Sequence, residues 1–417
     1  MAKTIPEAAK RVQRIYLLLT LLSTLAASFI WGINTLFLLD AGLSNAQAFG
    51  ANALFTLGEV LFEVPTGVVA DTWGRRRSYL LGAATLLVST LLYLFMWRTR
   101  APFWGWALAS VLLGLGFTFF SGATEAWLVD ALAATGFTGK LETVMAKGQI
   151  ASGVAMLAGS VGGGFVAQLT NVGVPYALRS VLLGVLFVTA FFLMKDLGFM
   201  PASTSGARAE VRLVLKHSLD QGLRNPAVRW LMLAAPFSAG VSVYAFYALQ
   251  PYLLQLYGDQ RAFGVAGLAA ALIAGAQIVS GFIAPVMQRL FARRTTALLV
   301  ATVANCGCLA AVGLTRNFWV ALAEVVLMAL TWFVAQPLRE AYLNGAIPSA
   351  QRATVLSFDN LMGSAGGVVF QPALGRAADV WGYARTYWVG AIIQMAAVPF
   401  LVLARRLGAR ADSARAP

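Results

Sequence analysis

The sequence predicts an all-α polytopic membrane protein with twelve transmembrane helices, and three observations support this fold class. Of the 417 residues, 59% are hydrophobic and only 12% are charged, and the mean hydropathy is +0.73. Apolar runs of about 20 residues, long enough to cross a bilayer as a helix, recur along the whole chain. One sizeable polar insertion, residues 196–228, divides these runs into six plus six.

The predicted spans fall near residues 15–39, 48–70, 79–97, 103–132, 147–170, 175–195, 229–256, 263–288, 295–314, 318–344, 354–375 and 385–404. The first run is too long for the apolar core of a signal peptide, so we interpret it as a span and expect no cleavable signal. We therefore expect an N-terminal six-helix bundle over residues 1–195 and a cytoplasmic linker over 196–228. A C-terminal six-helix bundle with a short cytoplasmic tail follows over 229–417.

The net charge of +14 is explained by topology rather than by nucleic-acid binding. Basic residues concentrate in alternate loops, as in Lys10 and the run Arg75–Arg77, whereas the opposite loops hold few, such as Arg98 and Arg316. Positive residues accumulate on the cytoplasmic side of a membrane. The pattern predicts a multi-pass protein of the plasma (cytoplasmic) membrane with both termini in the cytoplasm. Its expected partner is the lipid bilayer, and no nucleic acid is expected.

The linker carries a predicted amphipathic helix. Its apolar residues recur at helical spacing among basic ones, a pattern typical of a helix lying on the inner leaflet. The apolar positions are Val211, Val214, Leu215 and Leu219, and the basic positions are Arg208, Arg212, Lys216 and Arg224. The sole histidine, His217, lies in this segment, and we interpret it as a surface residue in preference to a proton relay.

A short polar hairpin separates the second and third spans and is the most informative motif. It contains Gly67, Asp71, Gly74 and the three arginines Arg75, Arg76 and Arg77. We expect Gly67 to allow close packing of backbones and Gly74 to adopt a turn conformation that a side chain would resist. The Asp71 carboxylate can accept hydrogen bonds from a helix N-terminus or pair with an arginine.

The pattern Gly-x-x-x-Asp-x-x-Gly-Arg-Arg-Arg resembles the signature loop between spans two and three of the major facilitator superfamily. The resemblance implies two six-helix bundles that rock about a central site, hence a secondary active transporter and not an enzyme. The alternative is an ordinary basic turn that only sets topology. The sequence contains no phosphate-binding Gly-x-x-x-x-Gly-Lys-Ser/Thr loop and no metal cluster, so we expect an ion gradient as energy source and no cofactor.

A faint internal repeat accompanies the resemblance. Residues 125–132 and 340–347 both begin with Glu-Ala-aromatic-Leu at the ends of the fourth and tenth predicted spans. Residues 76–78, Arg-Arg-Ser, are echoed by residues 293–295, Arg-Arg-Thr, before the ninth span. These matches favour parallel halves, although the repeat is short enough to arise by chance.

Two glutamates lie deep within the second predicted span. At about 1.5 Å per residue, Glu63 is about 12 Å and Glu59 about 18 Å from Asp71, near the bilayer midplane. Their i, i+4 spacing places both on one helix face, where repulsion and lost hydration favour a bound proton on at least one of them. Pro65 favours a bend beside them. We interpret the pair as proton or cation handling. The alternative is a structural pair satisfied by polar neighbours.

Other acidic residues inside predicted spans are weaker candidates. Glu125 lies near the cytoplasmic end of span four and Asp359 lies in span eleven, and we add both to the proton-coupling set. Glu340 stands next to Arg339, and one interpretation is that the two residues form a structural salt bridge. Glu324 enters span ten from the outer side.

Polar and aromatic residues within the spans are candidates for the wall of a substrate cavity. They are Trp31, Asn34, Tyr244, Tyr247, Gln250 and Gln336. Aromatic residues in spans also serve in packing and in interface belts, which is the alternative for each of them. The two cysteines, Cys306 and Cys308, lie in an apolar span, where packing is the expected role.

The expected function is proton-coupled efflux of a small amphipathic or cationic organic molecule by a monomer. Residues 62–67 and 122–126 resemble a bacterial exporter or permease branch of the superfamily. Span five vaguely resembles the glycine-rich antiporter motif of drug exporters, but it lacks the Gly-Pro pair, and span four lacks the usual arginine. Two alternatives remain: a proton-coupled metabolite transporter for uptake or export, and a non-transporting receptor or scaffold on the same fold.

Overall fold

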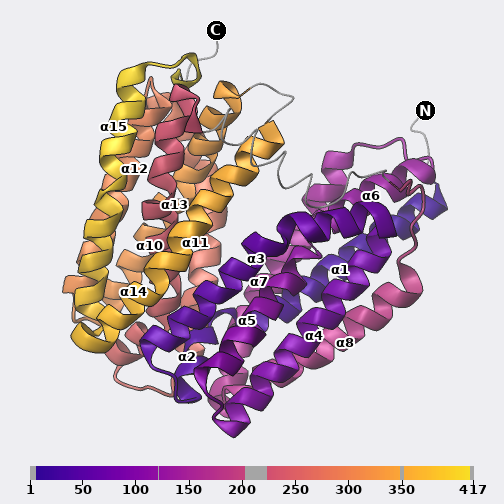
Figure 1. Ribbon diagram of the computed structural model, residues 1–417, viewed down its shortest axis with the longest axis horizontal. Helices are drawn as coiled ribbons and strands as arrows, with labels where there is room; N and C mark the ends of the chain where they lie inside the picture. Colours follow the sequence, from indigo (N-terminus) through magenta and orange to yellow (C-terminus); the bar gives the residue numbers. More distant parts are fainter. Residues whose placement is uncertain (1–5, 121, 202–222, 348–351, 414–417) are drawn as a thin grey trace. The chain divides into compact units, whose positions relative to one another are not determined.

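The computed structural model describes residues 6–120, 122–201, 223–347 and 352–413. Regular structure in these ranges is helical (Figure 1), apart from an isolated antiparallel bridge between Arg293 and Ser413. Eleven described segments are long and apolar enough to cross a membrane. The last, Val355–Leu407, contains the two final predicted spans, which meet at Gly382 with its non-helical φ of 79°. The predicted linker helix and His217 lie outside the described residues.

Contacts divide the chain into two compact units. The first comprises Met1–Gly42 and Leu54–Glu210, and the second comprises Leu43–Ala53 and Val211–Pro417. The contacts thus assign Leu43–Ala53, which the predicted domain boundaries place in the N-terminal bundle, to the second unit. One helix, α3, therefore contributes residues to both units.

The first unit contains eight helices of the described chain, with only the later part of α3 counted in it. They are α1 (Glu7–Trp31), α2 (Asn34–Asp40), α3 (Asn45–Trp73), α4 (Arg75–Thr99), α5 (Phe103–Thr118), α6 (Ala123–Ala134), α7 (Leu141–Leu169) and α8 (Gly173–Leu193). Two predicted spans are interrupted. The first breaks between α1 and α2, and the fourth breaks between α5 and α6, where Gly122 has a φ of 68°.

Glycines of α7 allow it to pack closely on α1. A Cβ atom at Gly163 would lie 1.9 Å from the Phe29 carbonyl oxygen, and one at Gly159 would lie 2.0 Å from Ser28 Oγ. The Ser28 hydroxyl also donates a hydrogen bond of 3.0 Å to the Ala155 carbonyl. Close helix packing therefore accounts for these two glycines of span five, whereas a side chain at Gly153 would meet open space.

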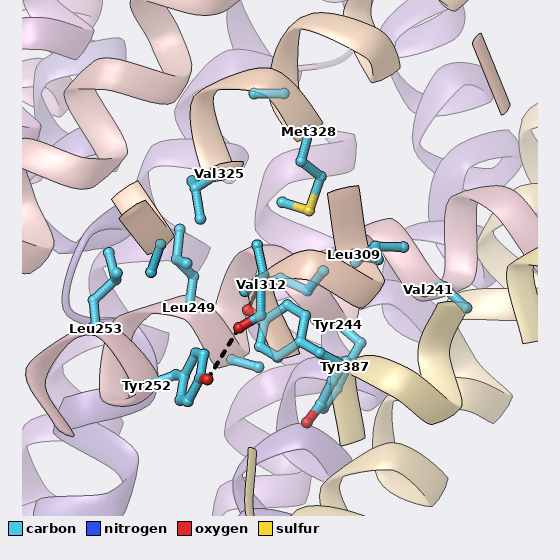
Figure 2. Packing of buried hydrophobic residues seen from close by; sticks show 14 of the residues in the cluster. Val241, Tyr244, Leu249, Tyr252, Leu253, Leu309, Val312, Val325, Met328 and Tyr387 are labelled. Carbon is cyan, nitrogen blue, oxygen red and sulfur yellow. Dashed lines mark hydrogen bonds between the residues drawn. The ribbon is translucent and has the colours of Figure 1, made fainter. Parts of the chain in front are cut away.

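The second unit consists of the remaining helices and the start of α3. They are α10 (Pro226–Tyr257), α11 (Phe263–Leu290), α12 (Arg294–Leu314), α13 (Phe318–Ala346), α14 (Arg352–Met395), α15 (Ala397–Leu407) and the short 3₁₀ helix Arg410–Asp412. Buried tyrosines organise one part of its core (Figure 2). Tyr252 donates a hydrogen bond of 3.0 Å to the Val312 carbonyl, and Tyr387 donates one of 2.9 Å to the Ala245 carbonyl.

The two units begin one pair of helices in the same way. The backbone N–H of Arg76, the second residue of α4, donates to Asp196 Oδ1 at 2.8 Å, and that of Thr295, the second residue of α12, donates to Asp412 Oδ1 at 2.8 Å. A carboxylate placed there satisfies a free amide and complements the helix dipole. The structure therefore matches Arg76 with Thr295, two positions away from the register of the predicted arginine repeat, which aligns Arg76 with Arg293.

Candidate functional site

A close helix crossing positions Glu59 in the first unit. A Cβ atom at Gly58 of α3 would lie 2.7 Å from the Val111 carbonyl oxygen of α5. A Cβ atom at Gly114 of α5 would lie 2.4 Å from the Phe55 carbonyl oxygen and 2.8 Å from the backbone nitrogen of Glu59. Since neither glycine can accept a side chain without movement, α5 fixes the backbone of α3 at the glutamate.

The two glutamates of α3 present their carboxylates differently. Glu59 is half-buried, and Glu63, one turn further along the helix, is exposed on the unit. The charge of Glu63 acts on Glu59. A carboxylate in the hydrocarbon part of a membrane is costly, so this face of α3 requires a polar or aqueous environment. The predicted juxtaposition of two acids on one face is therefore present in the structure.

Helix α3 continues through Pro65 as one helical segment. Proline lacks the N–H that would bond the carbonyl four residues earlier, which is that of Leu61. The Thr66 hydroxyl next to the proline donates to the Phe62 carbonyl at 2.8 Å and to the Glu63 carbonyl at 3.2 Å. The backbone carbonyls of Phe62 and Glu63 thus receive additional local hydrogen bonds beside the proline.

The signature loop forms an ion-pair cluster in the first unit. Arg75 pairs with Asp71 one turn earlier, and its Nε lies 3.9 Å from Asp130 Oδ2 on α6. The Arg76 guanidinium donates to the Phe191 carbonyl at 2.6 Å, while Arg77 is exposed. Arg75 therefore links the ends of α3 and α6, and it is the arginine partner that the sequence proposes for Asp71.

The two glycines of the loop have different environments. Gly74 precedes α4 with a φ of 109°, and an added Cβ atom would lie 2.4 Å from Asp196 Oδ2, so glycine is required at this turn. At Gly67, by contrast, an added Cβ atom would have no neighbour within 4 Å. The expectation that Gly67 serves close backbone packing is wrong for the described structure, because its Cα faces open space.

Glu125 lies in the first turn of α6, directly after the interruption of the fourth span. It is exposed, and its charge acts on Tyr16 of α1. The N-terminal turn of a helix favours a negative charge. The break that creates this N-terminus was not predicted, although Gly122 at the break is the residue type that a positive φ requires.

The second unit contains a buried ion pair between α13 and α14. Arg339 Nε donates to Asp359 Oδ2 at 3.3 Å, and its Nη2 donates to Asp359 Oδ1 and, at 3.0 Å, to the Leu231 carbonyl. Asp359 is only 8% exposed, whereas Glu340 is exposed. The expected pairing of Arg339 with Glu340 is wrong, because adjacent residues of a helix point in different directions.

The predicted cavity residues of the first half lie beside the break between α1 and α2. Trp31 is the last residue of α1, and Asn34 is the first of α2. Asn34 is buried and accepts a hydrogen bond of 2.9 Å from the Tyr176 hydroxyl of α8. Tyr176 in turn stacks on Phe37, with ring centroids 3.8 Å apart. Asn34 therefore has a structural partner inside the unit.

The predicted cavity residues of the second half divide between core and cavity. Tyr244 is 1% exposed and packs on Phe49, with ring centroids 4.7 Å apart, and Tyr247 is half-buried beside the same core. Gln250 lines a small pocket between α10 and α11, opposite Ala266 and Ile273. Gln336 donates a long bond of 3.5 Å to the Trp332 carbonyl within α13. Of these residues, Gln250 is therefore the one that the structure places beside a pocket within the second unit.

The charged side chains of these candidate sites are carboxylates and arginines. Among the described residues, no group of three or more His, Cys, Asp or Glu side chains is placed to hold a metal ion. The carboxylates of Glu59 and Glu63, by contrast, lie one helical turn apart on α3, and their predicted role in binding a proton or an organic cation stays a prediction. The buried Arg339–Asp359 pair is already satisfied within the second unit.

Comparisons with known proteins agree with this architecture. A family model described as Major Facilitator Superfamily matches residues 16–370. Sequence comparison with curated proteins finds no match.

Among solved structures, a bacterial homolog of the human lysosomal transporter Spinster, in an inward-facing and unoccupied conformation, has a TM-score of 0.75 at 16% identity, covering 99% of each chain. The nucleoside transporter NupG has a TM-score of 0.72 at 10% identity, covering 95% of this chain and 99% of that one. A D-xylose–proton symporter has a TM-score of 0.66 at 14% identity, covering 95% and 97%. At these identities the likeness concerns the fold, and it confirms the predicted twelve-helix architecture.

Proposed function

Because the chain belongs to the Major Facilitator Superfamily of secondary transporters, we propose that it exports small amphipathic or cationic organic molecules in exchange for protons. The observation that carries this proposal is the pair Glu59 and Glu63 on one face of α3, half-buried and exposed respectively. An intramembrane carboxylate costs roughly 2.5–3.5 kcal/mol on insertion scales, so packing alone is a poor reason for two of them.

The proposed coupling follows from the repulsion between the two carboxylates. Either a proton or a positively charged cargo relieves this repulsion, so the two compete for one place. A cargo that binds from the cytoplasmic side displaces the proton, and a proton that enters from the other side displaces the cargo. Alternating access of one site then couples cargo export to proton entry.

The remaining residues receive supporting roles in this proposal. Glu125 acts as a further proton-binding group, whereas Asp359 contributes to coupling only if it releases Arg339. The loop cluster of Asp71, Arg75 and Asp130 acts as a cytoplasmic gate. The cavity wall is proposed to include Trp31, Asn34, Tyr244, Tyr247, Gln250 and Gln336.

The proposal places the protein in the plasma membrane as a monomer with both termini in the cytoplasm. Its two bundles are residues 1–195 and 229–417, joined by the linker 196–228. The arrangement follows from the basic residues of alternate loops, which favour cytoplasmic termini.

A second candidate is proton-coupled transport of a neutral or anionic metabolite. It is favoured by the similar structures, which include a nucleoside transporter and a D-xylose–proton symporter. In this case the acids bind protons without touching the cargo, and binding of cargo does not compete directly with protons.

Binding of a fluorescent lipophilic cation to the purified protein distinguishes the two candidates. Direct competition predicts tighter binding as the pH rises from about 5 to 8, a range that brackets shifted carboxylates, and release of protons into weakly buffered solution. The variant Glu59→Gln/Glu63→Gln should lose the pH dependence. Affinity that is independent of pH in the parent protein contradicts cation exchange and favours the metabolite transporter. Reconstitution in liposomes with an imposed pH gradient and a cargo panel then identifies the cargo and the direction.

A further inference from the structure

The first turn of α3 is capped twice. Ser44 precedes the helix, and its N–H donates to Gln47 Oε1 at 3.1 Å while the Gln47 N–H donates to Ser44 Oγ at 3.3 Å. This reciprocal capping box is a local device that forms within one turn. It leaves the backbone N–H groups of Asn45 and Ala46 to find other acceptors.

The carboxylate of Asp379 on α14 accepts both remaining bonds. The Asn45 N–H donates to Asp379 Oδ1 at 2.8 Å, and the Ala46 N–H donates to Asp379 Oδ2 at 3.0 Å. Tyr383, just past the non-helical Gly382 of α14, donates its hydroxyl to the Asn45 side-chain oxygen. Residues on both sides of this break in α14 therefore bind the start of α3 through backbone and side chain, and the negative charge of Asp379 complements the helix dipole.

Close packing continues this contact along both helices. A Cβ atom at Gly375, one turn before Asp379, would lie 2.8 Å from the Asn45 carbonyl oxygen and 2.9 Å from the ring of Phe49. Phe49 is fully buried. These contacts explain why Leu43–Ala53 is counted with the second unit although the rest of α3 belongs to the first.

The hydrogen bonds to Asp379 are more readily replaced by water than those of the Arg339–Asp359 ion pair. They lie in exposed surroundings, so water can bond the carboxylate and both amides after separation. The capping box stays with α3 when Asp379 leaves, and the helix therefore keeps its start. The contact therefore holds the first turn of α3 against α14, and breaking it costs little free energy because water replaces the lost hydrogen bonds.

We propose that Asp379 is a positioning residue of the transport cycle. Its carboxylate clasps the first turn of α3 to α14 in the described state, and release of this clasp lets the segment 43–53 separate from α14 when the transporter changes conformation. The proposal rests on membership of a transporter family and on no particular cargo, coupling ion or direction.

Cysteine accessibility tests the clasp. Ala53 lies two turns after Asn45 on the same face of α3 and is 4% exposed. Ala53→Cys, in a chain with Cys306→Ala and Cys308→Ala, reports separation through its rate of alkylation by a water-soluble maleimide. Asp379→Asn places an amide N–H₂ opposite a backbone donor and removes the charge. We expect alkylation to become about tenfold faster, the effect of losing one hydrogen bond to a charged group.

Matched variants separate the clasp from a general loss of structure. Asp259→Asn is the control, because the Asp259 carboxylate accepts the local N–H of Arg261 in the loop after α10. It should change the rate less than twofold. Asn45→Pro removes one clasped N–H at a position where helices tolerate proline. It should accelerate alkylation. In the double variant Asn45→Pro/Asp379→Asn, the fold acceleration should be smaller than the product of the two single-variant accelerations.

A second cysteine identifies the outcome that overturns the proposal. Native Cys306 lies in α12, away from the clasp in sequence, and is 2% exposed. In a chain with Cys308→Ala and no cysteine at position 53, the alkylation rate of Cys306 reports general loosening of the structure. An unchanged rate at Ala53→Cys in Asp379→Asn overturns the proposal. An equal acceleration at Ala53→Cys and Cys306 also overturns it, because Asp379 would then only stabilise the fold. Selective acceleration at Ala53→Cys supports it.

Discussion

The two units treat an acidic residue inside the membrane in opposite ways. In the second unit, Asp359 is buried and held by both Nε and Nη2 of Arg339. In the first unit, Glu59 is half-buried and experiences the charge of a second carboxylate, Glu63, which is exposed. A buried, bidentate pair holds its charges permanently, whereas neighbouring carboxylates gain from each proton or cation that they bind. The comparison favours our proposal that exchange chemistry belongs to α3, and whether the pair in the second unit is structural is tested below.

The largest expected effect comes from breaking the buried pair. Arg339→Met should destabilise the protein by about 3–5 kcal/mol, because it leaves the Asp359 carboxylate buried without its partner. Thermal unfolding of the detergent-solubilised protein measures the change. The double variant Arg339→Met/Asp359→Leu should recover most of the loss, and Glu340→Gln, an exposed neighbour, is the control. Full transport by a folded Arg339→Met/Asp359→Leu protein would confirm that the pair is structural, and its loss would return Asp359 to the coupling residues.

The second prediction tests whether the helix crossing fixes the acids of α3. In Gly114→Ala the new Cβ atom would lie 2.4 Å from the Phe55 carbonyl oxygen, so α3 and α5 must separate. We expect a loss of about 1–3 kcal/mol, as for other overpacked interiors, together with slower transport. Gly153→Ala introduces the same methyl group into open space, so it should lower neither the free energy of unfolding nor the transport rate. Equal unfolding temperatures for the two variants would contradict the role of the crossing.

The third prediction concerns the carboxylates themselves. Glu59→Gln and Glu63→Gln remove charge with little change in shape, and at least one should reduce gradient-driven transport tenfold or more, ~1.4 kcal/mol. Uptake or release by proteoliposomes with an imposed pH gradient measures the rate. Unfolding temperature and expression should stay near those of the parent, since Glu59 is half-buried, Glu63 is exposed, and glutamine keeps the shape of both side chains. Normal coupled transport by both single variants and by the double variant would remove these residues from the mechanism.

The fourth prediction concerns the ion pair of the signature loop. The side chain of Asp71 is 42% exposed, so its pair with Arg75 should contribute only about 0.2–1 kcal/mol, as for surface pairs. Asp71→Asn should leave the unfolding temperature nearly unchanged while it alters the transport rate. A large loss of stability without a change in rate would assign the pair to the fold rather than to a gate.

Local chemistry explains which features of this protein are predictable from its sequence. The spans follow from apolar length, because a helix must cover the hydrocarbon thickness with its own hydrogen bonds. Gly74 follows from the need for a positive φ, and the i, i+4 placement of Glu59 and Glu63 follows from helix geometry. The resemblance to the family likewise rests on a contiguous motif, which is read without knowledge of any distant contact.

Contacts between residues far apart in the chain were decided by the tertiary structure alone. Arg339 pairs with Asp359 twenty positions away rather than with its neighbour Glu340, because the packing of α13 on α14 directs both side chains inward. Asp379 meets Asn45 across 334 positions. Periodicity reports which face of a helix is apolar, but it carries no information about which helix covers that face. The partner of each buried charge therefore emerges only when the helices pack.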